Sequence, residues 1–534
     1  MGQRGLTVAE HFDVVVVGTG FGGAAVACRL AQRGARVLVL ERGRRWTLAE
    51  YPRQAGDAWL YHPAKPEKLN GWLDLRFFRG MIVAQGAGVG GGSQCYSSVL
   101  MPADDNLFDD GWPPEITAAE LAAHYANVAK MLSVVQIPEG QMTGRAKLLA
   151  RAAERLGETE RFGRVPLGVV FDPDWNYELD NPLDVGHSRP FVNDHGQQQG
   201  TCVHLGNCDI GCDVRAKNTL DLNYIPAAER HGAQVRPLHV VRCVEPEGAG
   251  YKVRYDRIAD GTLVPGDVSA DRVVLAAGSL GSTELLLRCR DQYKTLPAVS
   301  AALGRRWSAN ANVFTTAAYH ADANVQQSIG PTITTGMDFM DGSVGGERFY
   351  IEDDGFPNML LGALTTRLRS GRVDPLAWAL QSHLRRGLDE KNPARNMMVW
   401  LGEGVDAGDG QLRIGRAPFA PWRRELRLTW DVSRSRRVID EIIATQRRLS
   451  ESTGGKFRVP LSWRLLRQLA TVHPLGGCTT GTSASDAVVD HRGEVFGYPG
   501  LFVADGSVLP GAVGRNPSMT IAALGERTAA LMSA

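Results

Sequence analysis

The sequence predicts an α/β protein, in which a domain built on a parallel sheet is interrupted by a discontinuous α+β domain on a mainly antiparallel sheet. Three observations predict this fold class. A β-branched run near the start leads directly into a glycine cluster, and a second glycine cluster follows at 86–92. The last seventy residues then combine a short apolar strand with a final helix. Hydrophobic residues make up 43% of the 534 residues, enough for a sizeable core.

The first unit is a strand, a glycine turn, a helix and a second strand. The run 12–17 is typical of a buried parallel strand. It continues into Gly18–Gly23, which satisfies G-x-G-x-x-G. We expect a helix over 24–33 and a second strand over 36–40, which ends in Glu41. The complete unit is far more specific than the glycines alone, and it predicts a Rossmann-like dinucleotide site.

Each residue of this unit has a physical task. Gly18 allows the sharp turn, and Gly20 lets the backbone approach a pyrophosphate. Gly23 lets the helix pack closely on the strand, and the helix N-terminus offers free N–H groups to phosphate. Glu41 can accept hydrogen bonds from both ribose hydroxyls and disfavours a 2′-phosphate, so NADP is not expected.

The wider context favours FAD over NAD. Glu41 continues into Arg42-Gly43, an E-R-G sequence often seen in FAD enzymes. The second glycine stretch, 86–93, precedes an apolar segment at 96–101. A nicotinamide dehydrogenase does not need this second backbone cradle, whereas the longer flavin cofactor does.

Three C-terminal motifs indicate a reacting centre that faces a flavin. They are His473-Pro474-x-Gly476, Asp505-Gly506 and Asn516-Pro517-x-x-Thr520. The apolar run 501–504 is expected to be a short strand, which places Asp505 at its carboxyl end, where open α/β sheets bind ligands. Pro517 suits the first turn of a final helix that runs to Leu531.

The chemistry of alcohol oxidation suits two of these residues. The O–H proton must leave while the C–H hydride passes to flavin N5. The imidazole of His473 can accept that proton or hold the alkoxide by a hydrogen bond. The amide of Asn516 can donate to the same oxygen without changing charge. The plainer readings are a buried structural histidine and a helix N-cap, and the N-cap is compatible with the catalytic role.

In this order, the three motifs resemble those of the glucose–methanol–choline (GMC) family of flavoenzymes. Their residues are most similar to those of its cholesterol-oxidase-like branch. The resemblance covers 12–101, 216–286 and 473–534, while the substrate-facing segments match poorly. It implies an FAD-dependent alcohol oxidase or dehydrogenase acting on a sterol or another apolar or ring alcohol, with His473 and Asn516 at the flavin N5 edge. The cofactor-binding residues that it implies are Gly18, Gly20, Phe21, Gly23, Glu41, Arg42, Gly91, Gly92, Tyr96, Ser97, Val241, Ala277, Gly278, Asp505, Gly506, Pro517 and Met519.

The sequence departs from the family pattern at one place near the cofactor. Where the cholesterol oxidase pattern has Asn-Gly-Gly, this chain has Tyr96-Ser97-Ser98. The departure leaves open how Tyr96 and Ser97 contact the flavin edge, and it leaves the exact substrate open as well. Since no histidine stands where some family members attach FAD covalently, we expect a non-covalent cofactor.

The two domains are expected to interleave along the chain. The FAD-binding domain takes 1–106, 200–312 and 459–534, and the substrate domain takes 107–199 and 313–458. Strands over 235–245, 251–257 and 273–276 are expected to form an antiparallel meander that returns to the nucleotide sheet. Alternating patterns at 411–414 and 425–428 predict a sheet over the flavin.

Two middle segments have no assigned task. Cys202, Cys208 and Cys212 have a spacing that hints at a metal knuckle, with His204 as a fourth ligand, but free thiols or a disulfide formed in vitro are favoured, and no metal is expected. The stretch 364–386 mixes arginines with leucines. It predicts an ordinary surface helix, with a lid or a peripheral membrane contact as the alternative.

Composition narrows the partners and the location. The formal net charge of +1 gives no general attraction for nucleic acid. No apolar run approaches the length of a membrane span, and the start has no signal-peptide pattern, so a cytoplasmic protein is expected. The electron acceptor, whether oxygen, a quinone or a redox protein, is left open. A lyase or isomerase with an idle flavin and a non-catalytic flavoprotein remain the alternative functions.

Overall fold

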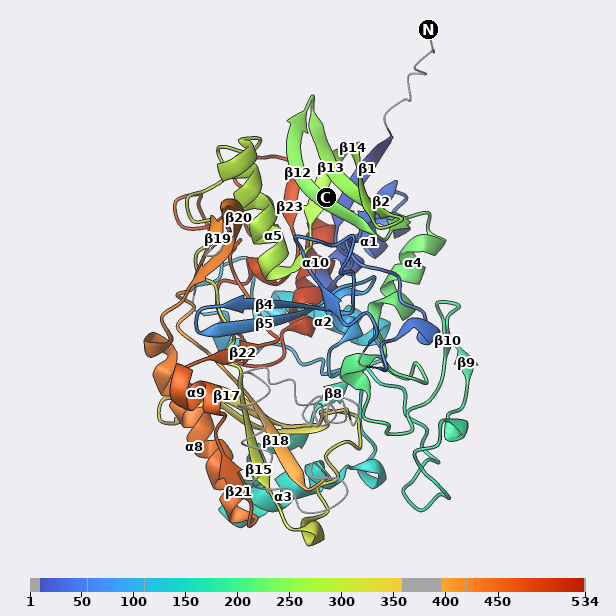
Figure 1. Cartoon of the computed structure of the whole chain (residues 1–534), viewed down its shortest axis with the longest axis vertical. Coiled ribbons are helices and arrows are strands. Elements are labelled where there is room, and N and C mark those ends of the chain that lie inside the picture. The colour runs from blue at the N-terminus through green and yellow to red at the C-terminus, as the bar shows by residue number, and fades with distance from the viewer. Residues whose placement is uncertain (1–9, 55, 110, 358–394, 418–419, 533–534) are drawn as a thin grey trace.

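The structure is a computed structural model, shown in Figure 1. It describes residues 10–54, 56–109, 111–357, 395–417 and 420–532. One large sheet lies in the upper half of the view and a second in the lower half, with a small four-stranded sheet between them.

The upper sheet is the predicted nucleotide-binding sheet. Its strands are β1 (His11–Val17), β2 (Val37–Leu40), β11 (Gln234–Arg236), β12 (His239–Glu247), β13 (Gly250–Ala259), β14 (Thr262–Leu275) and β23 (Leu501–Val503). The order β11-β2-β1-β14-β23 is parallel throughout, while β12, β13 and β14 form the expected antiparallel meander. Four valines of β1 are buried on both faces, which explains the continuous apolar run.

One predicted strand is wrong in its extent. The apolar pattern over 235–245 divides into two strands with different partners: β11 pairs with β2, and β12 pairs with β13. Pro237 stands between them and lacks the N–H that a continuous strand would need, and Leu238 adopts a positive φ of 61°. The chain therefore turns at this point from one side of the sheet to the other.

Helices cover this sheet and connect it to the rest of the chain. They are α1 (Phe21–Gln32), α2 (Ala118–Met131), α4 (Tyr224–Arg230), α5 (Gly278–Leu287) and α10 (Ser518–Met532). The predicted first and last helices are confirmed, although α1 begins at Phe21 rather than Ala24. α1 and α10 pack against each other, so the first and last helices of the chain form one layer.

The lower sheet is fully antiparallel, which confirms the fold class predicted for the second domain. Its order is β21 (Lys456–Arg458), β15 (Val313–Ala318), β18 (Met397–Gly404), β17 (Glu347–Asp354), β16 (Thr335–Val344) and β7 (Phe162–Arg164). The helices α3 (Gly144–Leu156) and α8 (Arg436–Ser452) pack against it. The four boundaries between the five predicted domain segments stay predictions.

The small middle sheet and one hairpin complete the architecture. The sheet has the order β22 (Leu469–Thr471), β5 (Met81–Gly86), β4 (Leu73–Phe78) and β3 (Leu60–Tyr61). The hairpin consists of β19 (Gln411–Ala417) and β20 (Ala420–Thr429). The remaining short elements are β6 (Val135–Gln136), β8 (Pro166–Leu167), β9 (Phe191–Val192), β10 (Gln198–Gln199) and α9 (Leu461–Leu466).

The alternating patterns at 411–414 and 425–428 do form strands, as predicted. Among the described strands, β19 and β20 pair only with each other, and β19 packs against α5 of the nucleotide-binding sheet. Glu425 and Leu426 of β20 line the cavity described below, and the place of this sheet over the flavin stays a prediction.

Two further expectations concern the membrane. The stretch 364–386 lies outside the described residues. Within the part of the chain that the structure does describe, no helix combines the length and the apolar character needed to cross a bilayer.

Candidate active site

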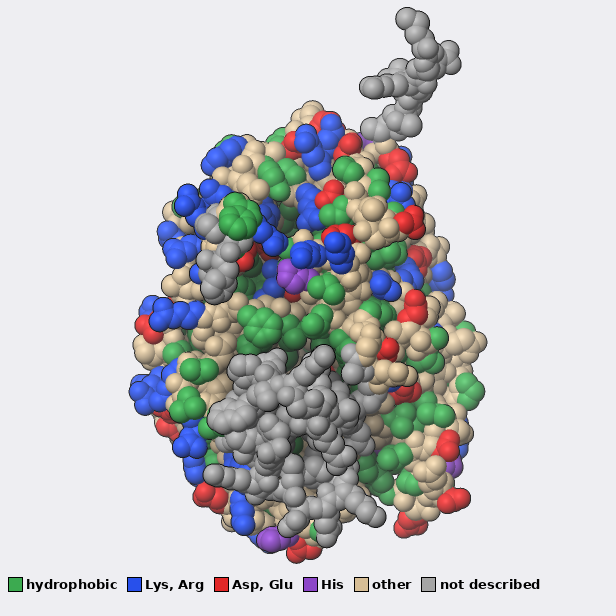
Figure 2. All heavy atoms as spheres, in the orientation of Figure 1, with side chains coloured by type: hydrophobic (Ala, Val, Ile, Leu, Met, Phe, Trp, Pro, Cys, Tyr) green, Lys and Arg blue, Asp and Glu red, His purple; other side chains and the backbone are tan. Residues whose placement is uncertain are grey.

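A cavity of about 1160 Å³ runs between the nucleotide-binding sheet and the antiparallel sheet. This volume exceeds the roughly 300–1,000 Å³ of pockets for drug-sized ligands, so a dinucleotide and a substrate could both fit. Figure 2 shows Lys and Arg side chains gathered in the upper part of this face, with hydrophobic side chains across its centre. Arg288, Arg423 and Arg424 line the cavity, and so do Phe77 and Phe78 of β4.

The first glycine turn forms one wall of the cavity. Gly18 has a φ of +102°, and a Cβ there would lie 2.4 Å from the carbonyl oxygen of Ala276. A Cβ on Gly20 would meet no atom within 4 Å, so this position faces open space. Gly23 packs against the turn instead, since its Cβ would lie 2.3 Å from the carbonyl oxygen of Gly18. The turn at Gly18 and the close packing at Gly23 are as predicted, while the approach of a pyrophosphate to Gly20 stays a prediction.

A threonine joins this turn to the end of the second strand. The Thr19 hydroxyl donates to Oε2 of Glu41 at 2.7 Å, and the Thr19 N–H donates to the same oxygen at 3.1 Å. Gly43 N–H donates to Oε1 at 2.9 Å. A carboxylate accepts about four hydrogen bonds, so the buried Glu41 retains capacity for a ligand hydroxyl.

The second glycine loop meets the first. A Cβ on Gly91 would lie 2.7 Å from the Cα of Gly20, and Gly90 N–H donates to the Thr19 hydroxyl at 3.0 Å. Gly92, like Gly20, has open space where a Cβ would stand. Two glycine-lined backbone segments thus face one cavity side by side, as a long phosphate-containing cofactor requires.

Asp505 fixes a part of the wall next to the first glycine turn. It follows β23, and one carboxylate oxygen accepts from Gly278 N–H at 2.9 Å and from the Ser282 hydroxyl. The other oxygen accepts from Ser507 N–H at 2.8 Å. The carboxylate therefore ties the start of α5 to the end of β23, and Gly278 and Gly506 line the cavity on either side of it.

His473 reaches the cavity with its orientation fixed by Asn312. The Asn312 Oδ1 accepts from Val472 N–H at 3.1 Å and from the Thr471 hydroxyl at 2.8 Å. Its Nδ2 therefore donates to Nδ1 of His473, 3.2 Å away. Burial lowers the pKa of His473 to about 3, so the ring is neutral near pH 7. A neutral ring that accepts at Nδ1 carries its proton on Nε2.

Asn516 lies at the same wall, against two buried carboxyl groups. Its Nδ2 donates to Glu403 at 2.9 Å and is 3.4 Å from Glu352. Glu403 also accepts from Asn310 and lies 3.4 Å from Nδ1 of His473. Burial raises the pKa of both glutamates well above 4.5, and Glu403 raises the pKa of Glu352 further. Two carboxyls this close hold a proton between them at neutral pH.

The alternation of the antiparallel sheet explains this clustering. Leu401 of β18 stands opposite Phe314 of β15 on one side and Glu352 of β17 on the other. Cross-strand partners share a face, so all three point the same way. Phe314 and Leu401 line the cavity, which identifies this as the face turned towards it.

The structure brings almost all of the predicted site residues to this cavity. Those that line it are Gly18, Gly20, Phe21, Glu41, Arg42, Gly91, Gly92, Tyr96, Ser97, Val241, Ala277, Gly278, His473, Asp505, Gly506, Asn516 and Pro517. Gly23 packs inside the turn, as described above. Met519 is buried in the first turn of α10 and is not among the residues that line the cavity, so its cofactor contact stays a prediction.

Sequence reasoning missed Asn312, Glu352 and Glu403. The only signal in the sequence is charge in an apolar strand: Glu403 stands in MMVWLGEG, and Glu352 in ERFYIEDD. Acidic side chains are rarely fully buried, so an acid within an apolar strand calls for an explanation. Without the sheet register, the sequence does not tell which strand faces the cofactor.

The cysteine trio is not arranged as a metal centre. Cys202, Cys208 and Cys212 are free thiols. His204, the fourth ligand considered, stacks on Trp175, and its two ring nitrogens contact Tyr177 and Gln141. Among the described residues, no group of three or more His, Cys, Asp or Glu side chains is placed to hold a metal ion.

Comparison with known proteins gives the family. The GMC oxidoreductase profile matches residues 412–525, and an NAD(P)-binding Rossmann-like profile matches 16–63. A cholesterol oxidase of Mycobacterium tuberculosis (strain ATCC 25618 / H37Rv) is 30% identical over 97% of this chain and 91% of its own length. A cholesterol oxidase of Acinetobacter baumannii is 29% identical over 97% and 93%. The crystal structure of pyridoxine 4-oxidase from Mesorbium loti superposes with a TM-score of 0.62, covering 98% of this chain and 99% of that one at 16% identity.

These matches define a flavin-dependent oxidoreductase. The chain belongs to the GMC oxidoreductase family and is an enzyme. The resemblance based on the three C-terminal motifs is confirmed, and so is the Rossmann-like fold.

The glycine geometry predicts two different outcomes for neighbouring substitutions. In Gly22→Ala, the new Cβ would lie 1.9 Å from the carbonyl oxygen of Ala504, so we expect the apoprotein to lose about 1–3 kcal/mol of stability or more. In Gly20→Ala, the Cβ enters open space at an ordinary φ of −70°, so the apoprotein should keep its melting temperature and bind FAD more weakly. Thermal melts of the apoproteins and FAD titrations measure both.

Gly140→Ala is the matched control, since its Cβ also meets no atom within 4 Å and it lies away from the cavity. Equal loss of apoprotein stability in Gly20→Ala and Gly22→Ala would contradict this assignment.

Proposed function

We propose that the enzyme oxidises an alcohol to a carbonyl compound, with FAD bound non-covalently in the cavity and His473 and Asn516 at the reacting centre. One observation carries the proposal: His473, with its tautomer set by Asn312, and Asn516 line the same cavity as the two glycine loops. The cradle fits FAD, because Gly20 and Gly92 leave open space beside the backbone and Glu41 retains acceptor capacity. When bound, FAD supplies the acceptor for the hydride at N5.

His473 holds the substrate oxygen as a hydrogen-bond donor. No described residue hydrogen-bonds to its Nε2, and the side chain keeps 13% of its surface accessible beside the cavity. The Nε2–H therefore serves the alcohol oxygen as negative charge develops on it. Because burial lowers the pKa of His473 to about 3, the ring is a weak base, and holding the oxygen is favoured over removing its proton.

The alcohol proton passes to the pair Glu352 and Glu403. The repulsion within a buried pair leaves one carboxyl protonated and the other able to take a proton. Oε1 of Glu352 has no hydrogen-bond partner among the described residues, and neither has Oδ1 of Asn516. Two orphaned acceptors at the reacting end suit a donor that arrives with the substrate.

The substrate compartment is apolar in its middle. Val99, Phe314, Ile333 and Leu401 line the cavity beside the reacting residues. This lining supports a substrate with an apolar body, such as a ring alcohol, and the names of the cholesterol oxidases at about 30% identity support the same class. A sterol is one member of that class.

Removing the imidazole tests the reacting centre. We expect His473→Ala to keep FAD and the visible flavin spectrum but to lose about 10²–10⁴-fold in the rate of anaerobic flavin reduction by an alcohol, the usual contribution of a positioned proton-transfer or hydrogen-bonding group. Since the pKa of His473 is near 3, the wild-type rate should show no step from this group between pH 5 and 9.

Stopped-flow absorbance across an alcohol panel measures these rates, with His320→Ala, an exposed histidine, as control. Unchanged reduction in His473→Ala would contradict the proposal. Turnover of an alcohol without any bleaching in the wild type would favour a lyase or isomerase with an idle flavin.

The tautomer can be inverted by one substitution. In Asn312→Asp, an acceptor replaces the donor beside Nδ1, so the proton moves to Nδ1 and Nε2 loses it. We expect flavin reduction to slow by about 10²-fold or more with FAD retained, since a wrong tautomer disables the ring without removing it. Nitrogen-15 NMR of the histidine ring reports the tautomer directly. Asn324→Asp, at an exposed position, is the control, and an unchanged Nε2–H tautomer in Asn312→Asp would contradict this assignment.

Acid precipitation tests the non-covalent cofactor. The cysteine beside the second glycine loop, Cys95, lines the cavity, and burial raises its pKa to about 11, which keeps the thiol protonated and unreactive. We therefore expect all yellow colour in the supernatant and the protein mass of the bare chain. A protein heavier by one FAD would contradict the expectation.

A further inference from the structure

Beyond the reacting end, the cavity wall carries two carboxyl groups that the chemistry of alcohol oxidation does not use. Asp354 ends β17, and Asp209 lies in the loop of the cysteine trio. Both line the cavity. They are close enough that Asp209 adds to the effect of burial in raising the pKa of Asp354.

The sheet register places Asp354 relative to the reacting end. Asp354 follows Glu352 by two residues on β17, so the two side chains share the face turned towards the cavity, about 7 Å apart along the strand. The cross-strand partners are Leu401 for Glu352 and Val399 for Asp354. The two acids are therefore separated by about the length of a small ring, with apolar cross-strand neighbours on β18 beside them.

One oxygen of Asp354 is available to a ligand. The side chain is nearly buried, with 6% of the residue exposed. Oδ1 accepts from Gly355 N–H at 2.9 Å, while no described residue donates to Oδ2. A carboxylate oxygen of a residue that lines a cavity, and to which no described residue donates, can accept a hydrogen bond from a ligand in that cavity.

Asp209 is held in place through one carboxylate oxygen, while the other oxygen has no donor among the described residues. Its Oδ1 accepts from the Ser97 hydroxyl at 3.1 Å, and no described residue donates to Oδ2. Burial raises the pKa of Asp209 to about 6. Lys217 lies behind it, with its ammonium group on three backbone carbonyls, those of Gln94, Tyr96 and Cys208.

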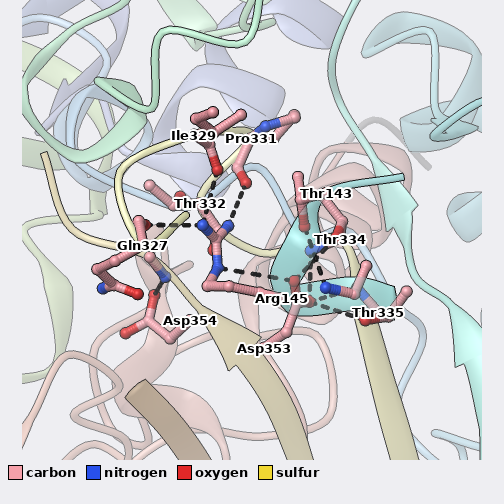
Figure 3. A network of polar contacts seen from close by, with 12 residues as sticks. Thr143, Arg145, Gln327, Ile329, Pro331, Thr332, Thr334, Thr335, Asp353 and Asp354 are labelled. Carbon is pink, nitrogen blue, oxygen red and sulfur yellow. Dashed lines mark hydrogen bonds and ion pairs between the residues drawn. The ribbon is translucent and has the colours of Figure 1, made fainter. Parts of the chain in front are cut away.

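A buried arginine supports the other carboxyl. Figure 3 shows Arg145 surrounded by the carbonyl oxygens of Gln327, Ile329, Pro331 and Thr332, with Asp353 and Asp354 on the adjoining strand. Arg145 is fully buried and attracts the charge of Asp354. The chain thus already provides positive charge for both acids, Lys217 behind Asp209 and Arg145 behind Asp354. The group that completes them is therefore a neutral donor rather than a cation.

We infer that Asp209 and Asp354 bind a second hydroxyl of the substrate, so that the enzyme acts on an apolar ring diol, with one hydroxyl at His473 and the other at these two acids. The inference rests on the proposed alcohol oxidation and adds the substrate class to it. It also assigns a task to the cysteine segment, which brings Asp209 to the cavity. An alcohol with only one hydroxyl would place an apolar group against both acids, and a site built for a hydroxyl rejects such analogues strongly.

Matched alcohols test the inference with the wild-type holoenzyme. The probes are cyclohexane-1,4-diol against 4-methylcyclohexanol and benzene-1,4-dimethanol against 4-methylbenzyl alcohol. Anaerobic flavin reduction gives a limiting rate and an apparent dissociation constant for each. In at least one pair, we expect the ratio of limiting rate to apparent dissociation constant to be about tenfold or more higher for the diol. Most of this difference should come from tighter binding of the diol. Equal values within both pairs would overturn the inference but leave alcohol oxidation standing, whereas no reduction by any alcohol would overturn the proposed function and the inference with it.

Variants locate the discrimination. The variants Asp354→Leu and Asp209→Ala are tested separately. In each, the preference for the diol should fall to the small factor that arises because either of its two equivalent hydroxyls can react. The 4-methyl analogues should react as before or faster. Asp354→Asn, which keeps hydrogen-bonding capacity, should retain part of the preference and serves if the leucine variant does not fold. Glu347→Gln removes a carboxylate from the opposite end of β17, away from the cavity, and should change nothing. A preference that survives in both acid variants would overturn the inference.

Discussion

The hydrogen bond from the Asn312 amide to Nδ1 of His473 is the interaction on which the site depends. Asn312 lies just before β15 of the antiparallel sheet, and His473 follows β22 of the middle sheet, so the bond joins two parts of the chain that are far apart in sequence. The same amide is held by Val472 N–H, which removes the ambiguity between its oxygen and its nitrogen. The orientation of the ring, its tautomer and the free Nε2–H all follow from this one contact.

Around this contact, the alternation of side chains along the strands places polar and apolar residues on defined faces of the sheet. The cavity-facing side of β17 carries Glu352 and then Asp354, while Leu401 and Phe314 on the neighbouring strands supply the apolar surface. The opposite side of β17 carries Asp353, which accepts from Thr334 and Thr335 and stays in the core. A shift of one residue in the register would exchange these faces, so the antiparallel pairing itself fixes which acids lie on the cavity-facing side of β17.

The sequence predicted the nucleotide side of the site far better than the substrate side. Gly18, Gly20 and Glu41 sit in a local motif whose geometry is determined by a turn and two short elements, and the motifs at His473, Asp505 and Asn516 are equally local. Glu352 and Glu403 are different, because their meeting depends on pairing between strands about fifty residues apart in sequence. The same limit applies to the hairpin: alternation at 411–414 indicates a strand with one buried face, but it does not tell that α5 covers that face.

The most direct test of the central claim is a high-resolution structure of the holoenzyme with FAD and a non-oxidisable alcohol analogue. The account predicts that Nε2 of His473 lies within hydrogen-bonding distance of the analogue's oxygen, that Asn516 lies at the same edge of the isoalloxazine ring, and that Asn312 still donates to Nδ1. A structure in which FAD occupies the glycine cradle while the imidazole points away from both the ring and the alcohol oxygen would contradict it.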